Sequence, residues 1–355
     1  MALTGAMSAA ITGLKAHMDA LNVVGNNVAN VNTYGYKAGR VTFRESIYST
    51  QSAGAAGTTT MGGTNPRQIG YGTSVGTIDL DMATSSLEST GYGLDVAIQG
   101  DGFFLVGPKD LTFANSEELA KLSFSKVGDF RFDADGYLVD GAGNVVYGFL
   151  ASSGAEDAGT VAADDPSMVL APIRLPWKST ADATLNEAVY VGFTEGNNQN
   201  NEPAADTVDG FVTLENISID ENGCITGTNK DTNNPVVVGY IALGTVANPN
   251  GLLHTDGPYY TAGEAAGAVR LSTPNSSVTG NLNNQADDDV IDTDPNAMLA
   301  EGSEVGLMPG FLEASGTDLA TEFSNMIIYQ RGYQANTRII TVTDSMLEEL
   351  VNIKR

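Results

Sequence analysis

The sequence predicts a mainly β protein with an α-helix at each terminus, and three observations lead to this fold class. Apolar residues recur at helical spacing over the first thirty and the last forty residues. Between these ends, short runs alternate apolar and polar residues with a period of two. An acidic, less periodic stretch interrupts those runs. We therefore expect nested domains, in which N- and C-terminal coiled-coil helices flank a discontinuous β domain with an inserted small β domain.

The N-terminal helix is expected from two apolar columns whose members are seven residues apart. Together the columns have the alternating spacing of three and four residues that is typical of a heptad helix. Glycine and asparagine at positions 25–27 interrupt the pattern, so this helix is marginal in isolation. The columns are Leu3, Ala10, His17, Val24 and Val31, and Met7, Leu14, Leu21 and Val28.

The C-terminal helix is expected from a longer column with the same period. A second column contains three polar residues (Phe323, Gln330, Thr337, Asp344 and Val351), so the tail also needs a partner. We expect the other end of the chain to supply it, with Thr317 as the N-cap of the tail helix. The alternative is that both ends are ordinary amphipathic helices packed on a globular core. The complete column is Leu312, Leu319, Met326, Tyr333, Ile340 and Leu347.

Charge is distributed unevenly along the 355 residues. The formal net charge is −26, and the middle of the chain carries all of it because the two ends sum to zero. Near-neutral ends can pack against copies of themselves, while an acidic middle stays solvated. The chain has no basic patch, which argues against nucleic acid as a partner.

The middle of the chain divides by composition. Residues 34–70 are expected to form an extended linker, because positions 49–66 are rich in Gly, Thr, Ser and Ala. Residues 71–148 and 214–316 carry the strand patterns of the discontinuous β domain, and residues 149–213 form the inserted domain. The expected strands are 74–80, 94–99, 102–106, 129–132, 137–139, 145–150, 216–219, 224–226 and 236–243.

The sequence offers little for catalysis or for a cofactor. It has two histidines and one cysteine, Cys224, which argues against a histidine triad, a multi-histidine metal site and a disulfide framework. The loop at 132–136 lacks the ligand pattern of an EF-hand, and Gly70-Tyr71-Gly72 lacks the third glycine of a dinucleotide fingerprint. We expect no catalytic, cofactor or metal residues, with an enzyme or adhesin as the remote alternative.

Nothing in the sequence indicates insertion into a membrane. No apolar run approaches 18 residues, and the N-terminus has neither the basic region nor the apolar core of a secretory signal peptide. Any export must therefore follow another route.

Several ordered motifs resemble those of the bacterial flagellar rod and hook proteins. Positions 26–37 (NNVANVNTYGYK) resemble the N-terminal signature of this family, and positions 330–338 (QRGYQANTR) resemble its C-terminal signature. Positions 100–106 (GDGFFLV) resemble a central β motif. Positions 62–70 (GGTNPRQIG) are similar to a segment typical of the hook members. The resemblance covers about two thirds of the chain and leaves out 151–213 and 272–306.

The resemblance implies a non-enzymatic subunit of an extracellular flagellar tube, exported without a cleaved signal peptide. Chain length favours a hook subunit over a distal-rod or other axial subunit, because hook members carry an inserted outer domain. The implied partners are copies of the same chain, rod and hook–filament junction proteins, the hook cap and the flagellar type III export apparatus. The two helices, marginal alone, are expected to become ordered on assembly. The expected assembly interface comprises Leu3, Met7, Leu14, Leu21, Val24, Val28, Leu319, Phe323, Met326, Tyr333, Ile340 and Leu347.

Overall fold

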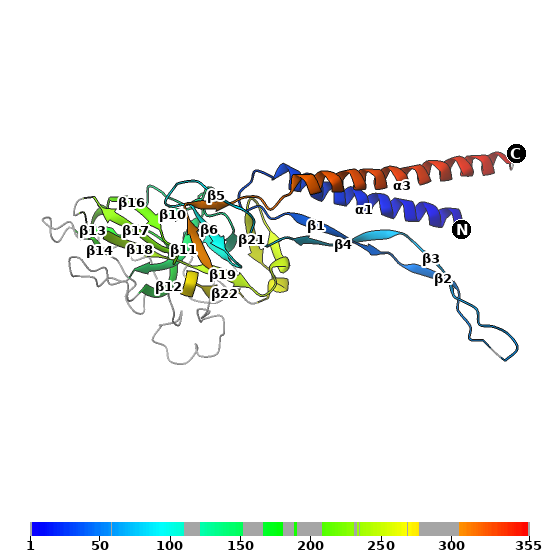
Figure 1. Ribbon diagram of the computed structural model, residues 1–355, viewed down its shortest axis with the longest axis horizontal. Coiled ribbons are helices and arrows are strands. Elements are labelled where there is room, and N and C mark those ends of the chain that lie inside the picture. Colours follow the sequence, from blue (N-terminus) through cyan, green and yellow to red (C-terminus); the bar gives the residue numbers. More distant parts are fainter. Residues whose placement is uncertain are drawn as a thin grey trace. The chain divides into compact units, whose positions relative to one another are not determined.

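The computed structural model describes residues 2–57, 59–109, 121–151, 166–179, 188–189, 208–230, 233, 235–267, 269–276 and 305–353. It consists of strands with one long helix at each end of the chain, which confirms the predicted fold class (Figure 1). The chain divides into two compact units. Unit 1 comprises Met1–Thr33, Lys37–Asp81 and Gly316–Arg355, and unit 2 comprises Tyr34–Tyr36 and Met82–Ser315.

Unit 1 contains the two long helices and a long β-hairpin. Helices α1 (Ala2–Ala29) and α3 (Leu319–Ile353) pack side by side, with the two chain termini at the same end of the pair (Figure 1). The hairpin pairs β1 (Gly39–Glu45) with β4 (Thr73–Leu80), and further out β2 (Tyr48–Ser52) with β3 (Arg67–Gly70). Strands β1 and β4 also pack on α1.

The hairpin differs from the extended linker expected over residues 34–70. Residues 39–45, 48–52 and 67–70 are paired strands, and Gly39, Arg40 and Val41 face Leu80, Asp79 and Ile78 across the ladder. These strands contain Val, Thr, Phe, Tyr and Ile, which favour extended pairing. They lack the strict alternation of period two because much of the hairpin is exposed. Composition alone therefore suggested a linker.

Unit 2 is built around a large antiparallel sheet. Its main path has the order β16-β17-β18-β11-β7-β8-β21-β20; β10 and β12 also pair with β11, β9 pairs with β10, and β19 pairs with β7 and β22. These strands are β7 (Phe103–Gly107), β8 (Ser123–Ser125), β9 (Arg131–Phe132), β10 (Leu138–Val139), β11 (Val145–Ala151), β12 (Pro166–Pro172), β16 (Leu214–Ile219), β17 (Cys224–Asn229), β18 (Pro235–Ile241), β19 (Leu243–Val246), β20 (Leu252–His254), β21 (Tyr259–Ala262) and β22 (Val269–Ser272).

Smaller sheets and turns complete unit 2. Strands β5 (Leu87–Ser89) and β24 (Phe311–Glu313) form one pair, and β6 (Val96–Gln99) and β23 (Gly306–Pro309) form another. A further small sheet has the order β14-β13-β15. The remaining elements are β13 (Trp177–Ser179), β14 (Ala188–Val189), β15 (Val208–Phe211) and the 3₁₀ turns η1 (Pro249–Gly251), η2 (Glu264–Ala266) and η3 (Pro274–Ser276).

The apolar core of unit 2 comes from both segments of the predicted discontinuous domain. Val96, Phe104 and Val146 from the first segment are buried together with Ile225 and Leu243 from the second. The apolar run 236–243, expected as one strand, is divided after Ile241. Strand β18 pairs with β17 and β11, while β19 pairs with β7 and β22. One continuous apolar run thus supplies two strands that pair in different parts of the sheet.

The region expected as an inserted domain does not separate cleanly from the large sheet. Strand β12 lies within residues 149–213, yet it pairs with β11 of the large sheet. The small sheet of β13, β14 and β15 also comes from this region. Residues 152–165, 180–187 and 190–207 lie outside the described residues, so the inserted domain stays a prediction for most of its length.

Candidate assembly interface

Helix α3 begins one residue later than the expected cap predicts. The cap is Asp318, not Thr317: Asp318 Oδ1 accepts from the Ala320 N–H at 3.0 Å, and Oδ2 accepts from Thr321 Oγ1 at 2.6 Å. The hydrogen bond from Thr321, and then that from Ala320, lower the pKa of Asp318 because they stabilise its charged form. Leu312, the first member of the predicted column, lies in strand β24 and not in the helix.

Small residues bring α1 and α3 close together. The buried face of α1 includes Ala10, Gly13, Ala16 and Ala20. A methyl group on Gly13 would lie 2.8 Å from Asn336 Nδ2 of α3, which is too close for an unshifted neighbour. The larger residues of the heptad columns flank this face. Most of them are only half buried, so close backbone approach and not leucine packing shapes the contact.

Asn27 connects three elements of unit 1 near the end of α1. Its side chain is buried, and Nδ2 donates to the Gly39 carbonyl at 2.8 Å and to Glu322 Oε1 at 3.0 Å. Its Oδ1 accepts from the Gly39 N–H at 3.0 Å. The side chain thereby pairs with the backbone at the start of β1 as a neighbouring strand would. It holds that strand and the first turn of α3 against α1.

A ring cluster occupies the middle of the helix pair. The His17 imidazole lies 5.5 Å from the Phe43 ring of β1 and 6.2 Å from the Tyr329 ring of α3, and the latter two rings are 5.8 Å apart. Gly332 makes room for the histidine, because a methyl group there would lie 2.6 Å from His17 Nε2. Burial lowers the pKa of His17, since desolvation disfavours the charged imidazolium.

The hairpin is fixed to α1 where β4 begins. Thr12 Oγ1 donates to the Tyr71 carbonyl at 3.0 Å. Gly72 has φ of +100°, and a side chain there would come within 2.9 Å of the Ala9 carbonyl. Tyr71 and Gly72 form a short break between β3 and β4 on one arm of the hairpin and not a turn, and Gly72 allows close contact with a helix.

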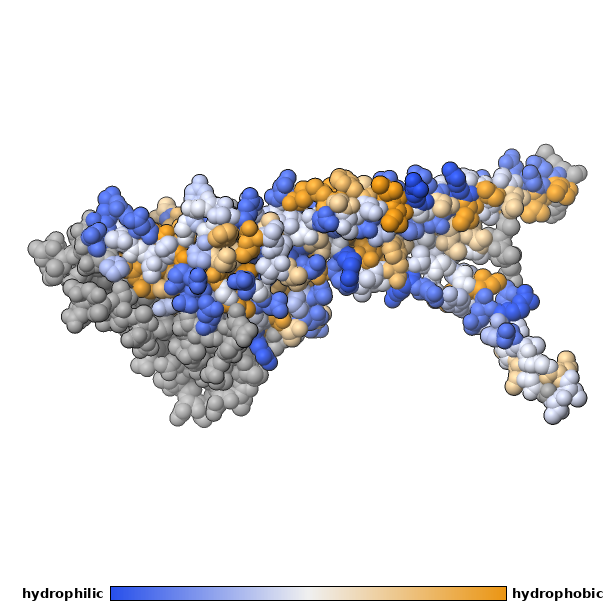
Figure 2. Space-filling model, in the orientation of Figure 1, coloured by the Kyte–Doolittle hydropathy of each residue, from blue (hydrophilic) through white to orange (hydrophobic). Residues whose placement is uncertain are grey.

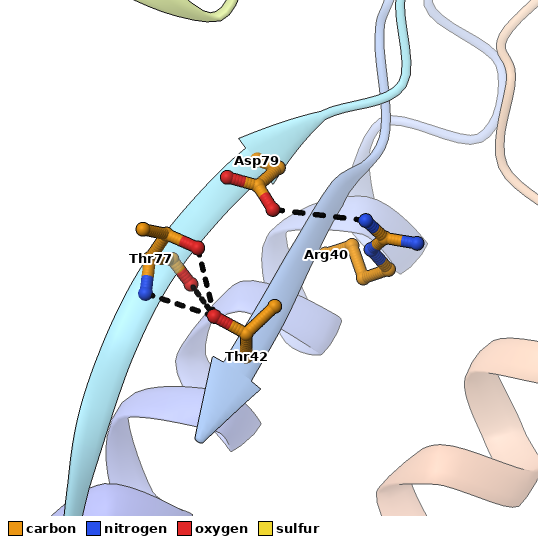
Figure 3. Close-up of polar contacts among 4 residues, drawn as sticks. All are labelled: Arg40, Thr42, Thr77 and Asp79. Atoms are coloured by element: carbon orange, nitrogen blue, oxygen red, sulfur yellow. Dashed lines mark hydrogen bonds and ion pairs between the residues drawn. The ribbon is translucent and has the colours of Figure 1, made fainter. Parts of the chain in front are cut away.

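Side chains support the ladder between β1 and β4 where its register shifts. The shift falls between Val41 and Phe43. Next to it, Thr42 Oγ1 accepts from the Thr77 N–H at 3.0 Å and lies 2.7 Å from Thr77 Oγ1 (Figure 3). Arg40 pairs with Asp79 at 3.7 Å on the same two strands. The hydroxyl thus gives a backbone N–H a partner where the regular ladder is interrupted.

Helix α3 carries apolar side chains that α1 does not cover. Phe323 and Ile327 are 50% and 53% exposed, although apolar groups of this size are usually buried. Figure 2 shows apolar surface along this helix. Such an extended apolar surface indicates contact with another molecule. Its members are Leu319, Phe323, Ile327, Ile328, Tyr333, Ile339, Val342, Met346, Leu347, Leu350, Val351 and Ile353, which we call the α3 apolar surface.

The residues expected at an assembly interface fall into two groups in a single subunit. Val24 is buried, and half-buried positions of the helix pair are occupied by Met7, Leu14, Leu21, Val28, Met326 and Ile340. Leu319, Phe323, Tyr333 and Leu347 instead belong to the α3 apolar surface. Leu3 lies in α1, but its side chain is outside the described residues. Ile327, Ile339 and Val342 also belong to this surface, but they lie outside both tail columns with a period of seven, so that period did not predict their place on it.

The described residues offer no obvious catalytic centre. Among them, no group of three or more His, Cys, Asp or Glu is placed to hold a metal ion. Cys224 is buried; burial, and then the charge of Asp220, raise its pKa to about 11. In the described parts of the chain, no helix has an apolar stretch that could cross a membrane. The described residues thus combine a strand-rich body with two terminal helices, one of which exposes an apolar surface.

Comparison with known proteins identifies the family. Residues 7–37 match the model "Flagella basal body rod protein", and residues 308–353 match "Flagellar basal body rod FlgEFG protein C-terminal". The flagellar basal-body rod protein FlgG of Bacillus subtilis is 34% identical over 345 residues, which cover 97% of each chain. The flagellar hook protein FlgE of Borreliella burgdorferi is 24% identical over 469 residues, covering 97% of this chain and 98% of that protein.

A shorter match has higher identity. The flagellar hook protein FlgE of Treponema pallidum is 38% identical over 142 residues, which cover 40% of this chain and 28% of that protein. The chain belongs to the family of flagellar rod and hook axial proteins. It is a structural component of the flagellar basal body or hook and not an enzyme.

Proposed function

We propose that this chain is the subunit of the flagellar hook and that it assembles, copy upon copy, into a flexible tube that transmits torque from rod to filament. The observation that carries the assembly proposal is the α3 apolar surface, which a single subunit leaves exposed. Head-to-tail contacts through such a surface build an open helix when the rotation between copies does not close a ring. Burial of the surface by neighbouring copies supplies the driving force.

Two features favour the hook over the rod. Residues 62–70 carry the segment similar to hook members, and they run into strand β3 of the hairpin. The chain also has the extra region 149–213, which we assign to the outside of the tube, with 71–148 and 214–316 as its wall. Weak, wet contacts between the acidic outer regions of neighbouring subunits would let them slide as the tube bends.

A distal-rod subunit is the second candidate. It is favoured by the Bacillus subtilis rod protein FlgG, which matches 97% of this chain at 34% identity. Both candidates predict a helical homopolymer outside the cell membrane, reached through the flagellar type III export apparatus. They differ in their neighbours, since a hook subunit contacts the rod, the hook cap and the hook–filament junction proteins.

Electron microscopy of a strain that lacks the gene separates the two candidates. A hook subunit predicts that assembly stops at a completed rod, and re-expression of the chain restores a curved hook. Basal bodies that lack the distal rod would instead support the second candidate. A strain expressing the chain without residues 149–213 provides a further comparison: we expect secretion to continue and the curvature or stiffness of the hook to change.

A further inference from the structure

His17 is a half-buried residue with one buried ring nitrogen, and the assembly proposal does not use it. It lies between Phe43 and Tyr329. Its Nδ1 atom is buried and has no hydrogen-bond partner, while Nε2 faces Gly332, which has no side chain. A buried polar atom without a partner costs free energy, so its retention in an otherwise small and apolar face requires an explanation.

We propose that His17 is a proton-sensitive contact that loosens the α1–α3 pair when it becomes charged. The neutral ring fits among two aromatic rings and a glycine. A protonated ring would place a charge and a second N–H donor in the same space, where the structure provides no acceptor for Nδ1. The helix pair should therefore be held more tightly when the ring is neutral than when it carries a proton.

Charged groups on the elements packed against His17 do little to stabilise its protonated form. On α3, Tyr329 contacts the ring, and Glu322 lies ten residues before Gly332, which is about 15 Å along a helix. On β1 and β4, Arg40 pairs with Asp79, Arg44 Nε donates to Ser74, and Glu45 accepts from Tyr48. The nearby charges of α1 itself, Lys15 and Asp19, are exposed. At about 15 Å the Glu322 carboxylate is too far away to accept a hydrogen bond from the ring.

The direction of the pH effect follows from the lowered pKa of His17. The unfolded chain binds this proton at about pH 6.5, whereas the folded chain binds it only at lower pH. Stability of the helix pair should therefore be constant above about pH 7 and should fall as the pH drops from 6.5 toward the folded pKa. Below that pKa this contribution does not change further.

The full chain allows a clean test because it has only one other histidine, His254 in β20. In H254Q, the remaining histidine resonance belongs to His17, and NMR titration of the full chain should give a pKa below 6.5. Urea unfolding followed by helical circular dichroism should show a lower midpoint at pH 5.5 than at pH 7.5 in both wild type and H254Q. In H17Q this shift should shrink.

Two results would overturn the proposal. One is a titration of His17 in folded H254Q at or above pH 6.5. The other is an H17Q protein whose unfolding midpoint shifts with pH as much as that of wild type. The NMR titration uses the natural helix pair, so it decides the question even if H17Q fails to fold. Neither measurement depends on whether the chain builds a hook or a rod.

Discussion

The Asn27 amide donates to the Glu322 carboxylate at 3.0 Å and joins two residues that are 295 positions apart in the sequence. The same amide group pairs with both backbone groups of Gly39. One side chain therefore holds the end of α1, the start of β1 and the first turn of α3. Because this side chain is buried, its removal leaves its buried partners without these hydrogen bonds.

Replacement of this side chain should weaken unit 1. We expect Asn27→Ala to lower the free energy of unfolding by about 1–3 kcal/mol, since it leaves buried partners unsatisfied. Urea unfolding followed by helical circular dichroism measures the effect. Asn22→Ala, at an exposed position of the same helix, is the matched control and should change stability by less than about 0.5 kcal/mol. Equal effects of the two variants would show that Asn27 does not connect these elements.

Two glycines of the helix pair should respond to alanine in opposite directions. Alanine at an exposed helical position is more stable than glycine by about 1 kcal/mol, and Gly25 has no neighbour within 4 Å of an added methyl group. Gly25→Ala should therefore stabilise α1. Gly332→Ala should destabilise the pair, because its methyl group would lie 2.6 Å from His17 Nε2.

A double variant tests the cause of the second effect. In a His17→Ala background the ring is gone, so Gly332→Ala should recover its favourable helix propensity. Thermal unfolding of the four proteins in this cycle gives the coupling between the two positions. If Gly332→Ala costs the same in both backgrounds, the glycine is not required by the histidine.

The helices themselves could be predicted from the sequence, but the face that joins them could not. A period of seven identifies an apolar column without stating what covers it. Met326 and Ile340 from the predicted column lie half buried in the helix pair, while Phe323 and Leu347 are exposed. Gly13 and Gly332, which carry no apolar signal, leave room for Asn336 and His17 of the facing helix. Apolar residues occur on more than one side of α3, so periodicity could not select one face.

In the hairpin and the large sheet, too, several strands could be predicted from the sequence but the pairing of distant strands could not. Alternation predicted β4, and β9 and β10 lie within the expected strands 129–132 and 137–139. The pairing of β1 with β4 depends on contacts between distant residues, including Thr42 with Thr77, which no local pattern reveals. Signature motifs indicated the family, and one of them contains Asn27, whose role becomes visible only in three dimensions.

A charge on the α3 apolar surface should prevent polymerisation without unfolding the subunit. Phe323 is half exposed, so Phe323→Asp removes little packing within the chain. It places a charge where a neighbouring copy would bury an apolar ring, which is costly. Electron microscopy should show tubes from wild type and none from this variant. Ser324→Asp adds the same charge at an exposed polar neighbour and is the control. Normal tubes from Phe323→Asp would show that Phe323 does not lie in the interface.

The free subunit should have less protected terminal helices than its β core. The contact between α1 and α3 is built from small and half-buried side chains, whereas Phe104, Val146 and Ile225 are fully buried in unit 2. Amide hydrogen exchange of the monomer should therefore be faster in α1 and α3 than in β7, β11 and β17. Assembly should slow exchange in the helices more than in the strands. Uniform amide protection across the monomer would contradict the expectation that the terminal helices become ordered on assembly.

The thiol of Cys224 should be unreactive in the folded protein. Its pKa is raised to about 11, so almost none is thiolate at pH 8, and the residue is also buried. Iodoacetamide should modify it slowly at pH 8 in buffer and much faster in urea, where both burial and the raised pKa are lost. Mass spectrometry of the single cysteine gives both rates without a competing thiol. Fast labelling in buffer would show that β17 opens readily, because access to this thiol requires that strand to separate from its neighbours.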